Sequence, residues 1–185
     1  MSTCRLIESI YSNVGGFYYI KGPCTAIPED SDIDEGSIIS LFNDVYPDKT
    51  DIAVMSDTIH ELNIRILYSI DKTTLADITR NHPSASLQYH LTDMIREIYR
   101  SGKDTIAVVN SGDFADIVVI KDGKLLSLNQ KSTDTYELMY TIAKIWSDFG
   151  FKKGHGTIRL NGFKETNSFK DNLTQMTGEY TVCVL

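Results

Sequence analysis

The chain has 185 residues, of which 42% are hydrophobic and 23% are charged, values typical of one compact domain or two small subdomains. Its 25 acidic and 18 basic residues give a formal net charge of −7, with a pI near 5.0. Because nucleic acids and anionic membranes are bound largely through lysine and arginine, this balance counts against a protein that binds either.

The first half of the chain predicts a mixture of strands and helices. Alternating apolar residues and turn residues predict, in chain order, strands at 5–12 and 17–26, a helix at 35–46, strands at 51–55 and 63–70, a short helix capped by Asp71, a strand at 84–89, and a helix at 91–100 that ends near Gly102.

The second half is more regular. An apolar run at 104–109 predicts a buried strand, and strands at 114–121 and 124–130 flank Asp122-Gly123, a strong signal for a type I′ hairpin. A long helix at 135–149 follows, where Asp134 can cap the first turn and Glu137 can reach back in a capping box. A strand at 157–160, a helix at 168–176 and a strand at 180–185 complete the chain.

This order, β-β-β-α-β-α-β, predicts an α/β fold with a ribonuclease-H-like unit, the unit whose duplication builds the actin-like folds. We expect residues 104–185 to form that unit. Residues 1–103 are then a partial N-terminal α/β subdomain packed on it.

Sequence features outside this unit indicate no enzyme or metal site. The acidic run at 29–36 does not match a calcium loop. Such a loop needs Gly at its sixth position and Glu at its twelfth, and counting from Asp30 these positions hold Glu35 and Leu41. His60-Glu61 lacks the second histidine of a zinc protease, since Ile64 stands there. Cys4, Cys24 and Cys183 are isolated, no segment is long and apolar enough to span a membrane, and no secretory signal precedes residue 16. We therefore expect reduced cysteines, a cytoplasmic protein and no membrane span.

One turn carries the candidate site. Actin-like proteins place an Asp-x-Gly phosphate loop between the first two strands of each unit, and here Asn110 and Gly112 occupy the Asp and Gly places, with Ser111 and Asp113 beside them. Gly162 falls where such proteins carry a Gly-Gly turn under the adenine. Asparagine lacks the charge that attracts Mg²⁺, so these residues are at most candidates for weak nucleotide binding. The other interpretation is that Gly112 and Gly162 are simply turn glycines.

A nuclease of the ribonuclease H type needs clustered carboxylates that hold two metal ions. Its first-strand carboxylate falls at Asn110 and is missing, although Asp113, Asp116 and Asp134 are nearby in sequence. Asp134 is better explained as a helix cap. We therefore expect no nuclease activity and no catalytic residue.

The ten tyrosines allow two interpretations. Tyrosine is favoured at partner surfaces, but its ring also packs at core edges with the hydroxyl in water. Packing is the favoured interpretation for the tyrosines within predicted elements, which are Tyr18, Tyr19, Tyr89, Tyr99, Tyr136 and Tyr140.

With these residues in view, the chain resembles an uncharacterised family of Bacteroidetes-type bacteria, domain of unknown function 3822. The resemblance covers most of the chain and is carried by packing and turn patterns: residues 24–29, 66–70, 82–90 and 122–129, then Asp134, Tyr136 and Tyr140, then residues 160–162. It implies an actin-like ATPase-type fold and no known activity.

The resemblance also implies that members of the family begin with an additional phosphate-loop hairpin, and we expect this chain to start after it. That start would leave an unpaired sheet edge near residues 5–12 and the option of a homodimer. We expect a non-catalytic interaction or scaffold protein with an unknown protein partner and no cofactor. The alternative is a nucleotide-binding or nucleotide-hydrolysing regulator of the actin-like superfamily that uses ATP with Mg²⁺.

Overall fold

The computed structural model describes residues 7–9, 17–112, 114–152, 154–163, 167–177 and 181–184. Internal contacts divide the chain into two compact units, residues 1–96 and 97–185, and the division falls inside helix α3 (Thr92–Ser101). Each unit has its own sheets and its own hydrophobic cluster. Within the described ranges, no helix combines the length and apolar character needed to cross a bilayer.

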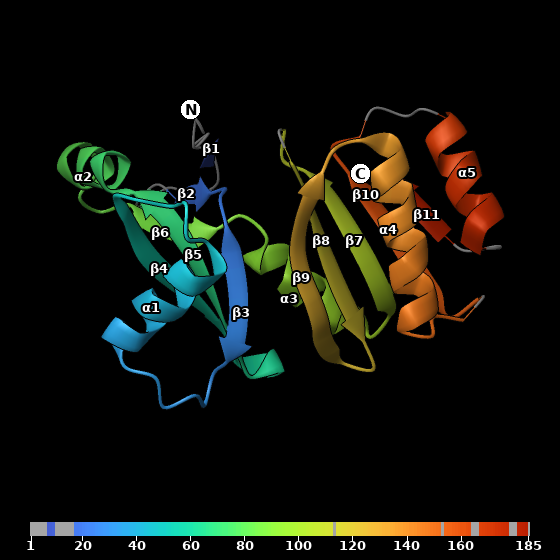
Figure 1. The fold of residues 1–185 in the computed structure, drawn as a ribbon, viewed down its shortest axis with the longest axis horizontal. Coiled ribbons are helices and arrows are strands. Elements are labelled where there is room, and N and C mark those ends of the chain that lie inside the picture. The colour runs from blue at the N-terminus through green and yellow to red at the C-terminus, as the bar shows by residue number, and fades with distance from the viewer. Residues whose placement is uncertain are drawn as a thin grey trace. The chain divides into compact units, whose positions relative to one another are not determined.

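The first unit contains two three-stranded sheets (Figure 1). The first sheet has the order β1-β2-β6 and consists of Ile7–Ser9, Phe17–Ile20 and Ser86–Tyr89. The second has the order β3-β5-β4 and consists of Cys24–Pro28, Ile64–Asp71 and Ile52–Ile59. Helices α1 (Glu35–Val45) and α2 (Lys72–Asn81) and the short 3₁₀ helix η1 (His60–Leu62) connect the strands.

The single strand predicted at 17–26 is wrong, because the chain leaves β2 after Ile20 and enters β3 at Cys24, in the other sheet. Gly22 and Pro23 explain the break. A Cβ on Gly22 would lie 3.1 Å from the carbonyl oxygen of Ser69, and Pro23 has no N–H for a ladder. The Pro23 carbonyl instead accepts a hydrogen bond from Ser69 N at 3.2 Å.

Helix α1 covers one face of the β3-β5-β4 sheet through a cluster centred on Ile27, Phe42 and Leu67. Asp34, from the acidic run, begins the helix: its carboxylate accepts from Ser37 N at 3.0 Å and from the Ser37 hydroxyl at 2.7 Å. These hydrogen bonds lower the pKa of Asp34. Asp34 of the acidic run thus acts as a helix cap, at the end of a helix where acidic residues are favoured.

Asp57 of β4 joins the two sheets of the first unit. One carboxylate oxygen accepts from Tyr89 N at 2.7 Å and from the Thr92 hydroxyl at 2.6 Å, while the other accepts from the Tyr68 hydroxyl at 3.1 Å. Burial, with the neighbouring carboxylate, raises the pKa of Tyr68, so this phenol stays a hydrogen-bond donor. The Tyr68 and Tyr89 rings stack with centroids 5.5 Å apart.

The second unit confirms the predicted order of elements. Its strands are β7 (Asp104–Asn110), β8 (Phe114–Lys121), β9 (Lys124–Ser132), β10 (Gly156–Asn161) and β11 (Thr181–Val184), and its sheet has the order β11-β10-β7-β8-β9. The first three strands pair antiparallel, whereas β10 is parallel to both β7 and β11. Asp122 and Gly123 have φ values of 50° and 69°, as the predicted type I′ turn requires.

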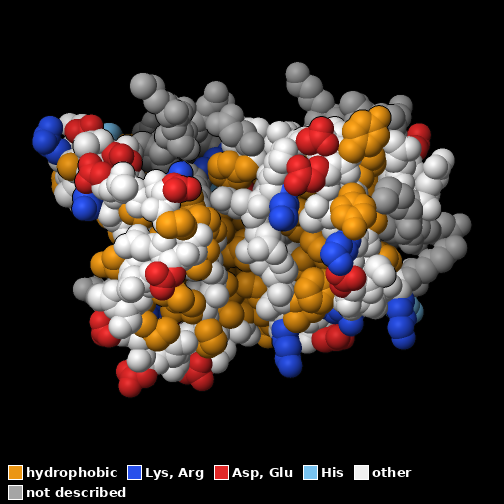
Figure 2. Space-filling model, viewed as in Figure 1, with side chains coloured by type: hydrophobic (Ala, Val, Ile, Leu, Met, Phe, Trp, Pro, Cys, Tyr) orange, Lys and Arg blue, Asp and Glu red, His pale blue; other side chains and the backbone are white. Residues whose placement is uncertain are grey.

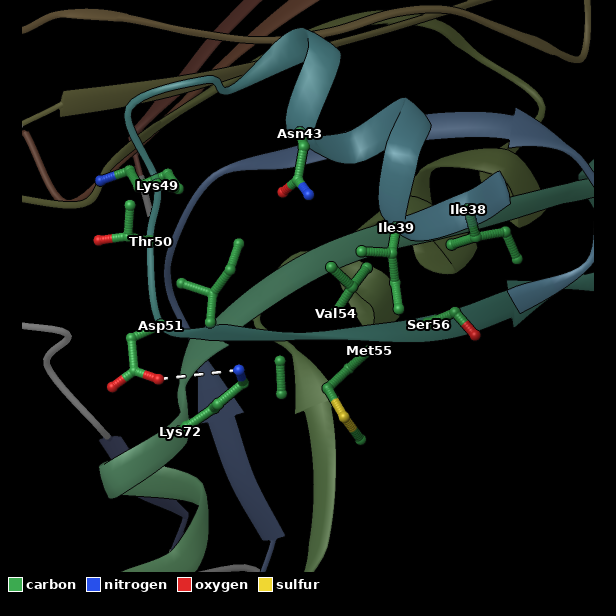
Figure 3. A pocket seen from close by; sticks show the side chains of 12 residues that line it. Ile38, Ile39, Asn43, Lys49, Thr50, Asp51, Val54, Met55, Ser56 and Lys72 are labelled. Carbon is green, nitrogen blue, oxygen red and sulfur yellow. Dashed lines mark ion pairs between the residues drawn. The ribbon is translucent and has the colours of Figure 1, made fainter. Parts of the chain in front are cut away.

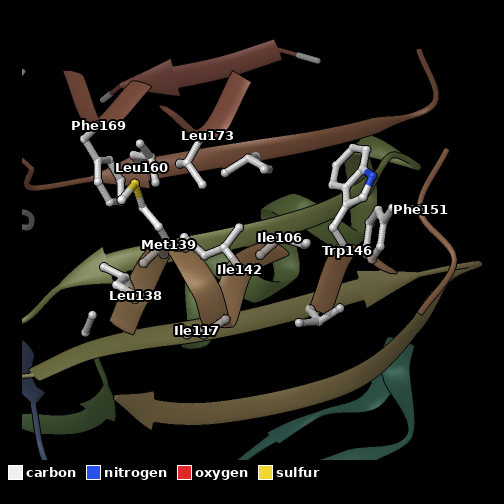
Figure 4. Packing of buried hydrophobic residues seen from close by; sticks show 14 residues of the cluster. Ile106, Ile117, Leu138, Met139, Ile142, Trp146, Phe151, Leu160, Phe169 and Leu173 are labelled. Atoms are coloured by element: carbon white, nitrogen blue, oxygen red, sulfur yellow. The ribbon is translucent and has the colours of Figure 1, made fainter. Parts of the chain in front are cut away.

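Helices α4 (Thr135–Asp148) and α5 (Asn167–Thr177) lie side by side against the sheet of the second unit (Figure 1). Between them and the strands lies one cluster of buried side chains, including Ile106, Ile117, Ile142 and Leu173 (Figure 4). At one end of the cluster Trp146 and Phe151 stack with ring centroids 5.2 Å apart.

The N-terminus of α4 confirms the cap and corrects the capping box. The Asp134 carboxylate accepts from Tyr136 N at 3.1 Å and Glu137 N at 3.0 Å. The Asp134 N–H, however, donates to the hydroxyl of Ser132 at 3.1 Å. Ser132 at the end of β9 takes the place predicted for Glu137, because it already lies within reach when the chain turns into the helix.

Candidate functional site

The parallel pairing of β7 and β10 brings two distant turns together. Val109 lies opposite Asn161 in the register, so both strands end at the same edge of the sheet. The turn at residues 110–112 begins with the last residue of β7, and Gly162 follows β10. A Cβ on Gly162 would lie 3.3 Å from the carbonyl oxygen of Asn110, a measure of how closely the turns approach.

A cavity of about 410 Å³ lies at this edge, and the predicted site residues Asn110, Gly112 and Gly162 all line it. The remaining lining comes from the start of α4 and from two aromatic residues: Thr133, Thr135, Leu138, Phe163 and Phe169. The rings of Phe163 and Phe169 stack at 5.7 Å with an interplanar angle of 9°.

The sequence reasoning missed these additional lining residues. Thr133 and Thr135 could have been found, because the long predicted helix begins just after β9 and a helix after the third strand of such a unit starts at this edge. Phe169 carried no such signal, since it reaches the cavity only through the packing of α5.

The turn after β7 is closed by its own side chain. The Asn110 side-chain oxygen accepts from Gly112 N at 2.9 Å, and Ser111 N donates to the Phe114 carbonyl at 2.9 Å. Gly112 has a φ of 100°, which favours glycine. The amide oxygen of Asn110 and the N–H of Gly112, the two groups that a phosphate loop would direct at a ligand, are bonded to each other.

Of the other two predicted site residues, Ser111 is not among the residues that line the cavity, and Asp113 lies outside the described residues. The Ser111 hydroxyl donates to the carboxylate of Asp116 at 2.6 Å. Asp116 is fully buried and also accepts from Gln130 Nε2 at 2.9 Å. Its carboxylate thus stabilises the β7–β8 turn from inside the sheet.

The described residues around the cavity do not fit a magnesium-bound nucleotide. Their side chains are neutral, so neither a lysine nor an arginine is placed to neutralise phosphate. The first N–H groups of α4, which could bind an anion, are bonded to the Asp134 carboxylate. Within the described ranges, no three histidine, cysteine or acidic side chains gather as metal ligands.

Two tyrosines at the surface correct the packing interpretation. Tyr136 and Tyr140, one turn apart on α4, are 79% and 66% exposed. Tyr18 and Tyr89, by contrast, are buried as expected. Helix periodicity predicts the difference, because the buried face of α4 is formed by Leu138, Met139, Ile142 and Trp146.

The remaining histidine motif has a structural explanation. His60, in η1, is exposed and its Nδ1 lies 2.5 Å from the Glu29 carboxylate. This exposed pair connects the loop after β3 with the end of β4, and it involves no second histidine.

Comparison with solved structures places the fold. A protein of Bacteroides thetaiotaomicron, described as having an actin-like ATPase fold and unknown function, superposes with a TM-score of 0.78 at 19% identity. The match covers 89% of this chain and 65% of that one, so this chain spans about two thirds of the neighbour's length. The fold is therefore actin-like.

Comparison of sequences gives the family. The search of curated proteins finds no match. The model of the family described as protein of unknown function, DUF3822, matches residues 33–181, which is most of the chain. The chain belongs to this DUF3822 family.

Proposed function

We propose that the chain is a non-catalytic interaction protein that keeps an actin-like fold without turning over nucleotide. The observation that carries the proposal is the hydrogen bond of 2.9 Å between the Asn110 side-chain oxygen and Gly112 N. It closes the turn on itself at the position where the actin-like motif has a carboxylate, and the neutral cavity beside it offers no counter-charge for phosphate.

The exposed face of α4 supports the interaction half of the proposal. Figure 2 shows hydrophobic side chains at the surface over α4. Tyr136 and Tyr140 contribute to this surface, and aromatic side chains of this kind are enriched at protein interfaces and in their hot spots. We expect the partner to be a protein in the cytoplasm. A second copy of this chain is a further option, because β1 is the terminal strand of the β1-β2-β6 sheet among the described strands.

Calorimetric titration with ATP and Mg²⁺ tests the part of the proposal that says the chain does not turn over nucleotide. We expect no binding heat up to millimolar nucleotide and no phosphate release. Gly112→Val is the control, because valine is strained at a φ of 100° and disturbs the turn. Sub-millimolar binding that Gly112→Val abolishes, or turnover of MgATP, would overturn the proposal.

Site-specific photo-crosslinking tests the interaction half. A benzophenone amino acid at position 140 should form a discrete adduct in native cells, and Tyr136→Ser should reduce its yield. The same probe at Arg80, an exposed position on α2, is the matched control. Equal adducts at positions 140 and 80, or no effect of Tyr136→Ser, would contradict a partner surface on α4.

The alternative function, nucleotide binding, is favoured by one specific observation: both glycine turns converge on a single cavity. A ligand there would contact backbone and aromatic surface rather than cations. The same titration decides between the two functions, because binding without hydrolysis would support this alternative.

A further inference from the structure

A second cavity, of about 630 Å³, lies in the first unit between α1 and β4. Every residue from 49 to 56 lines it, together with Ile38, Ile39 and Asn43 of α1 and Lys72 of α2 (Figure 3). Successive side chains of a strand point to opposite faces, so a cavity that touches all of them lies along the edge of the strand. We name this cavity the β4 groove.

The edge of β4 that faces the groove has no strand partner in the described parts of the chain. Strand β4 ends the sheet order β3-β5-β4 and pairs with β5 along its other edge. Among the described residues, the hydrogen bonds from other elements to β4 lie at its far end, where the Thr58 carbonyl accepts from Arg96 at 2.9 Å and the Asp57 carboxylate accepts from Tyr89 N and the Thr92 hydroxyl. The backbone from Ile52 to Ser56 is therefore available for pairing.

The sequence of this edge lacks the usual protection against pairing. Exposed edge strands normally carry a charge, a proline or a bulge that prevents another strand from adding. Residues 52–56 read Ile-Ala-Val-Met-Ser, with neither charge nor proline, and their pairing with β5 continues without a shift. Above the edge, Ile39 of α1 is 48% exposed and offers an apolar surface to an added strand.

Charge at one end of the groove indicates the direction and chemistry of the occupant. Two lysines line the groove. Lys72 pairs with Asp51 at 3.7 Å, whereas Lys49, which is half-buried, has no ion pair among the described residues. Lys49 lies just before β4 begins. A strand that adds antiparallel ends beside this point, so its carboxyl end meets the ammonium group.

We propose that the β4 groove binds an extended apolar segment of a partner protein, which adds antiparallel to β4 and places a carboxylate at its carboxyl end beside Lys49. Main-chain hydrogen bonds to residues 52–56 would hold the segment, and the apolar lining of α1 and β4 would select its side chains. Each copy has a net charge of −7, a repulsion that a homodimer through β1 or through the groove would have to overcome, so a different protein is the favoured occupant of the groove. The proposal concerns the first unit and does not depend on the α4 surface.

Selection from a library of random octapeptides with free carboxyl ends tests the groove on the full chain. Enriched peptides should carry apolar residues at alternate positions, next to the free carboxyl end that all members of the library share. By fluorescence anisotropy, Ile39→Asp should weaken a selected peptide at least tenfold. Val45→Asp is the matched control, since Val45 is 49% exposed on the same helix but does not line the groove.

Two further measurements separate strand addition from simple apolar contact. Methylation of successive peptide nitrogens should abolish binding at every second position, because alternate N–H groups of an added strand point to β4. Amidation of the peptide's carboxyl end, or Lys49→Gln, should weaken binding about two- to fivefold, as for an exposed ion pair. Lys124→Gln, at an exposed position of β9, should not.

Several outcomes would overturn the proposal: no enrichment, equal binding to Ile39→Asp and Val45→Asp, a methylation profile without a period of two, or insensitivity to Lys49→Gln. Self-association that the peptide displaces would show that a second copy is the occupant instead. The double variant Tyr136→Ser, Tyr140→Ser should keep peptide binding, so failure of the α4 surface and failure of the groove are distinguishable.

Discussion

At the scale of single residues, Gly156 shows how tightly the second unit is packed. A Cβ at this position would lie 2.8 Å from the Trp146 ring and 2.9 Å from the Phe151 ring, and both rings are buried and stacked. Gly156→Ala should therefore lower the free energy of unfolding by about 1–3 kcal/mol, the usual cost of overpacking.

Urea denaturation followed by tryptophan fluorescence measures this change, because Trp146 is the chain's single tryptophan. Ser147→Ala, at an exposed position of α4, is the control and should stay within about 0.5 kcal/mol of the native chain. An unchanged midpoint for Gly156→Ala would mean that the two rings move apart without cost.

Asp71, the N-cap of α2, predicts a pH dependence. Its carboxylate accepts from the Thr73 hydroxyl, from Thr73 N at 2.9 Å and from Thr74 N at 3.1 Å, and these hydrogen bonds lower its pKa. A carboxyl with a lowered pKa stabilises the fold above its ordinary pKa, and this contribution is lost as the pH falls through the folded-state pKa.

The native chain should therefore exceed Asp71→Asn in stability at pH 7, and the difference should shrink towards pH 3. Asparagine is a suitable comparison because it still caps the helix while lacking the charge. Denaturation curves at the two pH values give the difference. A stability difference that grows between pH 7 and pH 3 would contradict the prediction that the charged form of Asp71 stabilises the fold.

At the scale of elements, the two sheets of the first unit depend on Asp57. Asp57→Ala leaves the Tyr68 hydroxyl, Tyr89 N and the Thr92 hydroxyl without this acceptor, and Tyr68, Tyr89 and Thr92 are all buried. We expect the variant to lose about 2 kcal/mol or more of stability, because unpaired buried polar groups are costly.

Amide hydrogen exchange locates the effect of this substitution. Protection should fall in β4 and β6 while β7 and β8 of the second unit keep theirs. Asp77→Ala, an exposed acidic position on α2, is the matched control and should change neither stability nor exchange. Uniform loss across both units would show that Asp57 does not act through the two sheets.

The elements also show which parts of the fold were predictable from sequence. The second unit followed from local signals: the Asp122-Gly123 turn fixes the β8–β9 hairpin, and Asp134 with the apolar face of α4 fixes the helix. The break between β2 and β3 was missed although the Gly22-Pro23 pair, which is typical of turns, signals it in the sequence. What separates the strands is the approach of Ser69 from β5, a contact made only in the folded chain.

The candidate site divides in the same way. Parallel strands end at one edge, so the predicted order was enough to place Asn110, Gly112 and Gly162 together. The bond from Gly112 N to Asn110 was not predictable, because an asparagine in a turn can equally face solvent or a ligand. The β4 groove was not predictable either, since the short apolar run that became β4 gave no sign of which edge would remain unpaired.

At the scale of the whole molecule, the net charge disfavours nucleic acids as partners. Binding of a nucleic acid releases counterions in proportion to the phosphates that lysine and arginine neutralise. With 25 acidic and 18 basic residues, the chain repels a polyanion on approach. We therefore expect no binding of a labelled 30-nucleotide single strand or the matching duplex at 50 mM salt.

Fluorescence anisotropy with both probes at increasing protein concentration measures this, and repetition at 200 mM salt gives the decisive comparison. Binding that weakens steeply with salt would mean that local lysines overcome the net charge. Charge reversal in the β8–β9 hairpin, which carries Lys121, Lys124 and Lys131, should then abolish that binding. A flat response in both salts would confirm that the chain does not bind nucleic acid, in agreement with the apolar and aromatic contacts that we propose at α4 and in the β4 groove.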